Sequence, residues 1–127
     1  MQILLRDNLP YTTVTLVYKG QRLTVSDVLI DTGSATSVFS ADVVQAIQIE
    51  PEPEDMLHTI RGVGGLEVVF ARRVDGLGVG GHFVPDFEIE VGGMDYGILL
   101  KGILGMDFLL RAGACLDLGR QTLEIGT

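Results

Sequence analysis

The stretch Leu29-Ile30-Asp31-Thr32-Gly33-Ser34-Ala35-Thr36 decides how this chain is interpreted, because it places one carboxylate directly after an apolar run. A strand that buries the run would carry Asp31 toward the interior, where an ionised carboxylate is costly unless it is hydrogen-bonded or paired. Thr32 and Ser34 supply hydroxyl groups, and Gly33 lets another group approach the backbone closely. Acids held in such surroundings are candidates for functional sites, so Asp31 is the first candidate catalytic residue.

A second motif lies about seventy residues further along the chain, at Ile103-Leu104-Gly105-Met106-Asp107-Phe108-Leu109. An apolar pair and a glycine open what we expect to be a short helix over residues 103–111. The two motifs, in this order and at this spacing, resemble the signatures of the retropepsin-like, single-domain aspartic proteases. The resemblance covers about residues 10–126. It implies an all-β, closed-barrel acid-protease fold with one or two short helices, and a single domain over residues 1–127.

One Asp-Thr-Gly motif supplies only half of the site that this family uses. Aspartic proteases work with two carboxylates that share one proton, because two like charges a few ångströms apart do not both ionise cheaply. The sequence has one Asp-Thr-Gly and no second copy. If the fold is catalytic, the second Asp31 must therefore come from another chain, related to the first by a twofold axis. We expect a homodimeric aspartic endopeptidase in which two Asp31 carboxylates activate a water molecule, without a metal or a cofactor.

The resemblance also implies supporting roles around Asp31. Thr32 would bond the loop of the second chain across the axis, and Gly33 and Ser34 would hold the plane of the carboxylate. A glycine-rich hairpin would act as a flap that closes over an extended peptide substrate, which binds as an added strand. The expected flap residues are Ile60, Gly62, Val63, Gly64 and Gly65.

The composition bounds the class of protein and its partners. The 127 residues fit one domain, and 46% hydrophobic with 20% charged residues argue against disorder. A formal net charge of −8 makes nucleic acid and anionic membrane surfaces poor partners. The sequence has no signal-peptide pattern and no apolar run long enough for a membrane span, so we expect a cytoplasmic protein. Because dimerisation joins two negatively charged chains, we expect dimers and activity to be favoured at mildly acidic pH, toward the pI near 4.5.

The distribution of β-branched, aromatic and turn residues predicts a chain built mostly of strands. We expect strands at residues 11–18, 23–30, 57–61, 66–70, 74–79, 82–91, 95–100, 114–117 and 122–125. Ser40 is expected to cap a short helix over residues 41–47. Cys115, the only cysteine, excludes an internal disulfide and is expected to be a small core residue.

Other patterns have simpler interpretations than a functional site. Asp107 would lie in the first turn of a helix, where a carboxylate is stabilised without any catalytic role. Gly76-Leu77-Gly78-Val79-Gly80-Gly81 has the glycine spacing of dinucleotide-binding loops, but a strand-like segment follows it where a helix is needed, so we interpret it as a turn. His58 and His82 lack a third ligand at metal spacing. The alternative function is a dimerisation or peptide-binding module of the same fold that has lost efficient catalysis.

Overall fold

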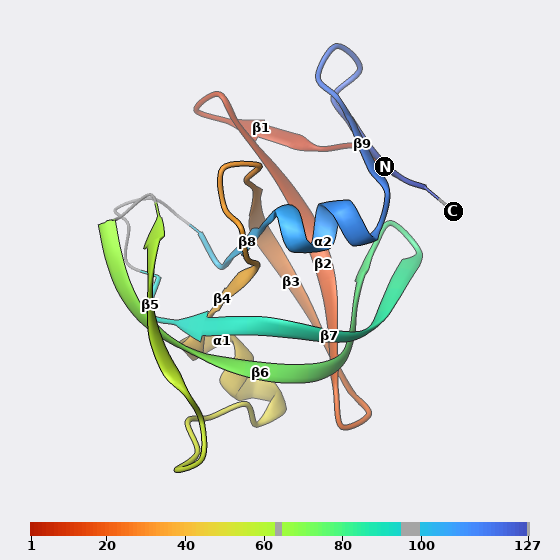
Figure 1. The fold of residues 1–127 in the computed structure, drawn as a ribbon. Coiled ribbons are helices and arrows are strands. Elements are labelled where there is room, and N and C mark those ends of the chain that lie inside the picture. The colour runs from red at the N-terminus through yellow and green to blue at the C-terminus, as the bar shows by residue number, and fades with distance from the viewer. Residues whose placement is uncertain (63–64, 95–99, 127) are drawn as a thin grey trace.

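The computed structural model describes residues 1–62, 65–94 and 100–126, and strands dominate these ranges (Figure 1). In chain order the elements are β1 (Leu4–Arg6), β2 (Leu9–Tyr18), β3 (Gln21–Ile30), β4 (Val38–Ser40), α1 (Ala41–Val44), the 3-10 helix η1 (Gln45–Ile47), β5 (Leu57–Gly62), β6 (Gly65–Val79), β7 (His82–Gly92), β8 (Gly102–Leu104), α2 (Met106–Arg111), β9 (Ala114–Asp117) and β10 (Thr122–Ile125). The prediction of a mostly β chain with one or two short helices is confirmed. In the part of the chain that is described, no helix combines the length and the apolar character that crossing a membrane requires.

Most of the strands belong to one large sheet. Its order is β1-β2-β3-β8-β4-β7-β6-β5, and β2 also pairs with β6. Within this sheet β3 runs parallel to β8 and β4 runs parallel to β7, whereas the other neighbours are antiparallel. β9 and β10 form a separate two-stranded hairpin. The parallel β3–β8 pair matters most for the site, because it brings residues 28–30 beside residues 102–104.

The structure corrects several predicted boundaries. Residues 102–104 form β8 rather than the start of a helix, so α2 begins at Met106. The apolar pair at 103–104 adopts a strand because β8 finds partners on both sides, β3 and β4. Residues 65–79 form one continuous strand instead of two, because β6 pairs with β5, β7 and β2 along its length. The strand predicted at 95–100 falls almost wholly outside the described residues.

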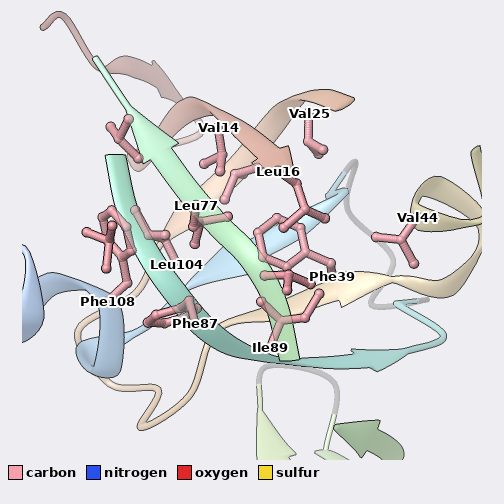
Figure 2. Packing of buried hydrophobic residues seen from close by; sticks show 14 of the residues in the cluster. Val14, Leu16, Val25, Phe39, Val44, Leu77, Phe87, Ile89, Leu104 and Phe108 are labelled. Carbon is pink, nitrogen blue, oxygen red and sulfur yellow. The ribbon is translucent and has the colours of Figure 1, made fainter. Parts of the chain in front are cut away.

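The main core is built from inward-facing residues of β2, β3, β6 and β7, with Phe39 from β4 and Phe108 from α2 (Figure 2). Phe108 packs edge-on against Phe87 of β7, with ring centroids 5.9 Å apart. Ile30 and Leu104, the last residues of β3 and β8, are buried in the same cluster. The ends of these two strands are therefore fixed by packing at the point where the chain enters the Asp31 motif.

Several predictions about single side chains can be compared with the structure. Ser40 is the N-cap residue of α1, and α1 and η1 together span the predicted residues 41–47, but the Ser40 side chain makes no capping hydrogen bond. Cys115 is exposed rather than buried, because β9 pairs only within a two-stranded hairpin. Gly80 and Gly81 adopt positive φ angles in the turn between β6 and β7, as the turn interpretation of that segment requires. His82 is exposed, and the side chain of His58 lies outside the described part of the chain.

Arg72 of β6 anchors the loop that precedes β5. Its guanidinium donates hydrogen bonds to Asp55 Oδ2 at 2.7 Å, to the Glu50 carbonyl at 2.9 Å and to the Tyr18 hydroxyl at 3.3 Å. The side chains of Arg72 and Asp55 are only 8% and 9% exposed. Burial lowers the pKa of Arg72, but the hydrogen bonds to Tyr18 and Asp55 outweigh burial and raise the pKa above its ordinary value. Arg72 therefore stays charged and holds the loop against the sheet.

Candidate active site

Asp31 is placed by the end of β3, where the two sequence motifs meet. In the parallel β3–β8 pair, Ile30 lies opposite Leu104. The next backbone amide, that of Asp31, donates a hydrogen bond to the Leu104 carbonyl at 3.0 Å. The second motif thus fixes the backbone of the first motif at the residue that carries the carboxylate.

A tight polar turn follows. The Gly33 amide donates to Asp31 Oδ1 at 2.9 Å, and the Ser34 amide donates to the Asp31 carbonyl at 3.1 Å. The Ser34 hydroxyl donates to the Thr36 carbonyl at 2.7 Å. Asp31 and Ser34 are half-buried, whereas Thr32 and Gly33 are exposed. The carboxylate is less buried than the apolar run before it predicted, because the turn leads the chain out of the sheet as soon as β3 ends.

The first turn of α2 supports this loop from behind. The Met106 amide donates to the Ser34 carbonyl at 2.8 Å, and the Asp107 amide donates to the Ala35 carbonyl at 3.2 Å. These amides are the donors that a helix leaves without internal partners at its N-terminus. Gly105 is required here, since a Cβ at this position would lie 2.3 Å from the Thr36 carbonyl oxygen. The loop and the helix start therefore form one hydrogen-bonded unit.

Ser37 and Asp107 complete that unit, and the role of Ser37 was not predicted from the sequence. The fully buried Ser37 donates from its hydroxyl to Asp107 Oδ1 at 2.7 Å and from its amide to Asp107 Oδ2 at 3.1 Å. Its hydroxyl also accepts a hydrogen bond from the Gly105 amide at 3.0 Å. Asp107 lies in the first turn of α2, as predicted, and its interaction with Ser37 explains it without catalysis. The only signal for Ser37 in the sequence was a hydroxyl residue directly before the apolar pair 38–39.

A family model for aspartyl proteases matches residues 14–108, a range that contains both motifs. The chain belongs to the aspartyl protease family. Its fold is similar to the crystal structure of a retropepsin-like aspartic protease from Rickettsia conorii, with a TM-score of 0.64 and 18% sequence identity over 89% of this chain and 88% of that chain. A search of curated proteins finds no match. The resemblance to the retropepsin-like family, stated from the two motifs, is thus confirmed.

In this member of the aspartyl protease family, β5 and β6 form the hairpin that was predicted to be the flap. The register pairs Ile60 with Glu67 and Gly62 with Gly65. β5 is the terminal strand in the sheet order, and the hairpin extends from one end of the sheet (Figure 1). Val63 and Gly64 lie outside the described residues, as do the side chains of residues 60–62. The backbone of the hairpin is therefore the part of the predicted flap that the structure describes.

The chemistry available around Asp31 is that of a carboxylate, hydroxyl groups and backbone amides. Among the side chains that the structure describes, no group of three or more His, Cys, Asp or Glu residues is placed to hold a metal ion. Asp31 accepts one hydrogen bond from the described part of the chain, through Oδ1. A carboxylate has about four acceptor positions, so Asp31 keeps capacity to bind a water molecule or a second carboxyl group.

Proposed function

We propose that this chain is an aspartic endopeptidase whose catalytic residue is Asp31. The observation that carries the proposal is the half-exposed Asp31 carboxylate, fixed by backbone hydrogen bonds within the motif of an aspartyl protease family member. Backbone hydrogen bonds fix the turn, and the carboxylate keeps acceptor positions for other groups. This arrangement suits a reaction in which the acid must bind water and substrate at a defined position.

The reaction needs two carboxyl groups that share one proton. The ionised group accepts a proton from a water molecule, and the oxygen of that water attacks the scissile carbonyl carbon. The protonated group donates its proton to the carbonyl oxygen, so a neutral tetrahedral intermediate forms. Proton transfer to the leaving amine then lets the C–N bond break. Close approach of two like charges is what keeps one of the two groups protonated.

A second copy of the chain would supply the second carboxyl group. The sequence offers one Asp-Thr-Gly motif, so a twofold axis beside Asp31 is the simplest way to build the pair. Thr32 is exposed next to Asp31 and would bond the loop of the other copy. Gly33, which donates to Asp31 Oδ1, and Ser34, which braces the turn, would keep the plane of the carboxylate.

The substrate would be an extended peptide held between the two Asp31 loops and the β5–β6 hairpin. A peptide strand can add to hairpin backbone by main-chain hydrogen bonds, with side-chain pockets giving specificity. Ile60, Gly62, Val63, Gly64 and Gly65 are the proposed flap residues. We also propose that residues 1–127 form one domain and that the sheet closes as a barrel, which the pairing of β2 with β6 favours.

Acidic pH is proposed to favour the dimer. Each chain carries a formal net charge of −8 at pH 7, so two chains repel one another, and acidification toward the pI near 4.5 reduces this repulsion. Sedimentation equilibrium near pH 5 and near pH 7.5 measures the dissociation constant directly. Tighter dimers at the higher pH would refute this part of the proposal.

The substitution Asp31→Asn tests catalysis. The amide cannot accept the proton from water, so we expect kcat/KM on a diverse peptide library to fall by about 10²–10⁴-fold between pH 4 and pH 7. Asp42→Asn is the matched control, because Asp42 is an exposed acid in α1 and should leave cleavage unchanged. Circular dichroism and sedimentation of both variants should match the wild type. Equal cleavage by the wild type and Asp31→Asn would instead favour the binding module.

A further inference from the structure

The outer face of the sheet is hollowed where β2 crosses the end of β6 (Figure 1). Val14 and Leu16 of β2 are fully buried in the main core, so the neighbouring Thr13 and Thr15 face away from it. Thr15 lies opposite Gly78 of β6. Because glycine has no side chain, the surface of β6 is left open beside Thr15.

The hollow has a volume of about 130 Å³, and its lining is mainly polar. Its lining side chains that can form hydrogen bonds are those of Thr13, Thr15, Arg22 and His82. The turn of Gly80 and Gly81 forms another part of the wall. Among the described residues that line it, none is Asp or Glu, although the chain contains 17 of these residues. We call this surface the Arg22 hollow.

Arg22 differs from the other arginines whose side chains the structure describes. Each of the others contacts a carboxylate or a backbone carbonyl of its own chain; they are Arg6, Arg72, Arg73, Arg111 and Arg120. In the described part of the chain, Arg22 has no hydrogen bond and no ion pair. A guanidinium group that is not neutralised by its own protein can bind an external anion through two parallel N–H bonds.

The turn between β6 and β7 adds backbone donors to the hollow. Val79 pairs with His82, so Gly80 and Gly81 form a two-residue hairpin turn. Within the residues that the structure describes, neither glycine amide donates a hydrogen bond to the chain. Successive amides in a turn can form a concave site for an anion. The arginine and the turn thus offer donors to the same small volume.

We propose that the Arg22 hollow binds a phosphate group, either as the free anion or as a monoester. Arg22 would supply the positive charge, and the hydroxyl groups of Thr13 and Thr15 would donate hydrogen bonds beside it. The amides of Gly80 and Gly81 would donate from the turn. A phosphate group has three or more strong acceptor oxygens, so it can use these donors together better than a carboxylate can. None of these residues belongs to either signature motif, so the site is additional to the proposed peptidase function.

An NMR titration of the wild type with sodium phosphate, at pH 7.5 and constant ionic strength, tests the proposal. We expect the amide signals of residues 13–15 and 78–83 to shift along one saturable curve. Arg22→Gln should raise the dissociation constant by about tenfold, because charged hydrogen bonds are lost. Thr15→Val keeps the shape of the side chain but removes the hydroxyl, and should raise the constant by about threefold.

Arg120→Gln is the matched control, because it removes the same charge from a side chain that is 82% exposed and does not line the hollow. It should change the dissociation constant by less than about twofold. Amide signals remote from the substituted residues should match the wild type in all three variants. The absence of a saturable shift, or equal effects of Arg22→Gln and Arg120→Gln, would overturn the site.

Two further ligands define the chemical class. Acetate should bind the same amides at least about tenfold more weakly than phosphate, since it has fewer acceptor oxygens. Equal binding of acetate would overturn the assignment to phosphate. O-Phosphoserine distinguishes the two sources of the group: binding as tight as that of phosphate supports a monoester, and binding of phosphate alone supports the free anion. Peptide cleavage is not measured in these titrations, so their failure would leave the proposed function unaffected.

Discussion

Asp31 and Asp107 are both acids of a signature motif, yet the protein treats them differently. Asp107 has both oxygens occupied, by the amide and the hydroxyl of Ser37, and its partner is fully buried. Among the described residues, Asp31 accepts a single hydrogen bond, from the Gly33 amide within its own turn. Asp107 joins two segments that are 70 residues apart in the sequence. The hydrogen bond of Asp31, in contrast, comes from a residue of the same turn.

Asp107 stabilises the structure through its hydrogen bonds to Ser37, whereas Asp31 is positioned by the hydrogen bonds of its turn. A carboxylate whose acceptor positions are filled by its own chain is a structural group, and removing it leaves buried donors unsatisfied. A carboxylate whose backbone is fixed but whose oxygens remain available can bind water or another acid. The start of α2 thus stabilises the Asp31 turn.

The largest expected effect is on stability, and it should appear at Asp107 rather than at Asp31. Asp107→Ala leaves the buried Ser37 amide and hydroxyl without their acceptor, so we expect the free energy of unfolding to fall by about 3 kcal/mol. Asp31→Ala should change it by no more than about 0.5 kcal/mol. Urea unfolding at pH 7.5 measures both. Equal losses at the two positions would break the distinction between the two acids.

A smaller loss is expected at Gly105, which tests whether the helix start fixes the Asp31 turn. The new Cβ of Gly105→Ala would lie 2.3 Å from the Thr36 carbonyl oxygen, so the loop must move, at a cost of about 2 kcal/mol. Peptide cleavage should fall together with stability. Gly119→Ala is the control, because its Cβ meets only a side-chain oxygen at 3.4 Å. A stable Gly105→Ala variant with normal cleavage would separate the turn from the helix.

The smallest of the three losses of stability is expected at Asp55, a third acid, which accepts a hydrogen bond from Arg72. Asp55→Asn weakens a buried charged hydrogen bond to Arg72 and should cost about 1.5 kcal/mol. The pKa of Arg72 is higher in the folded protein than in the unfolded chain. The stability that charged Arg72 contributes is therefore complete below the unfolded pKa and is lost only as the pH rises through the higher, folded pKa. The cost should therefore be the same at pH 7 and pH 9. Asp86→Asn, which affects the exposed pair with Arg73, should cost less than about 0.5 kcal/mol.

The fold was predictable where a local pattern decides the structure. The distribution of β-branched, aromatic and turn residues predicted β2, β3 and β7, and the two motifs together predicted the family. The short strands β1, β4 and β8 could not be predicted in this way. Each has three residues, which is too few for a period to be read, and each exists because a neighbouring strand supplies hydrogen bonds. The exposure of Cys115 could not be predicted either, because it depends on the position of β9 in a separate two-stranded hairpin.

The candidate site was predictable in its residue types but not in its supports. Asp31 and its turn follow from the motif, whereas the bond from its amide to the Leu104 carbonyl depends on the β3–β8 register. Ser37 was missed for the same reason, because its partner lies 70 residues away. Backbone carbonyls and amides make many of the hydrogen bonds that hold the site. The pairing of these groups cannot be predicted from residue types.

The parallel β3–β8 pair has a consequence for how the protein is made. A ribosome completes residues 28–36 well before it completes residues 102–107, at about 5–20 residues per second. Until the later segment emerges, the Asp31 turn lacks β8 and the amides of α2 that hold it. A growing chain therefore carries the acid without the frame around it. The Asp31 turn can therefore reach its final geometry only after the second motif has been synthesised.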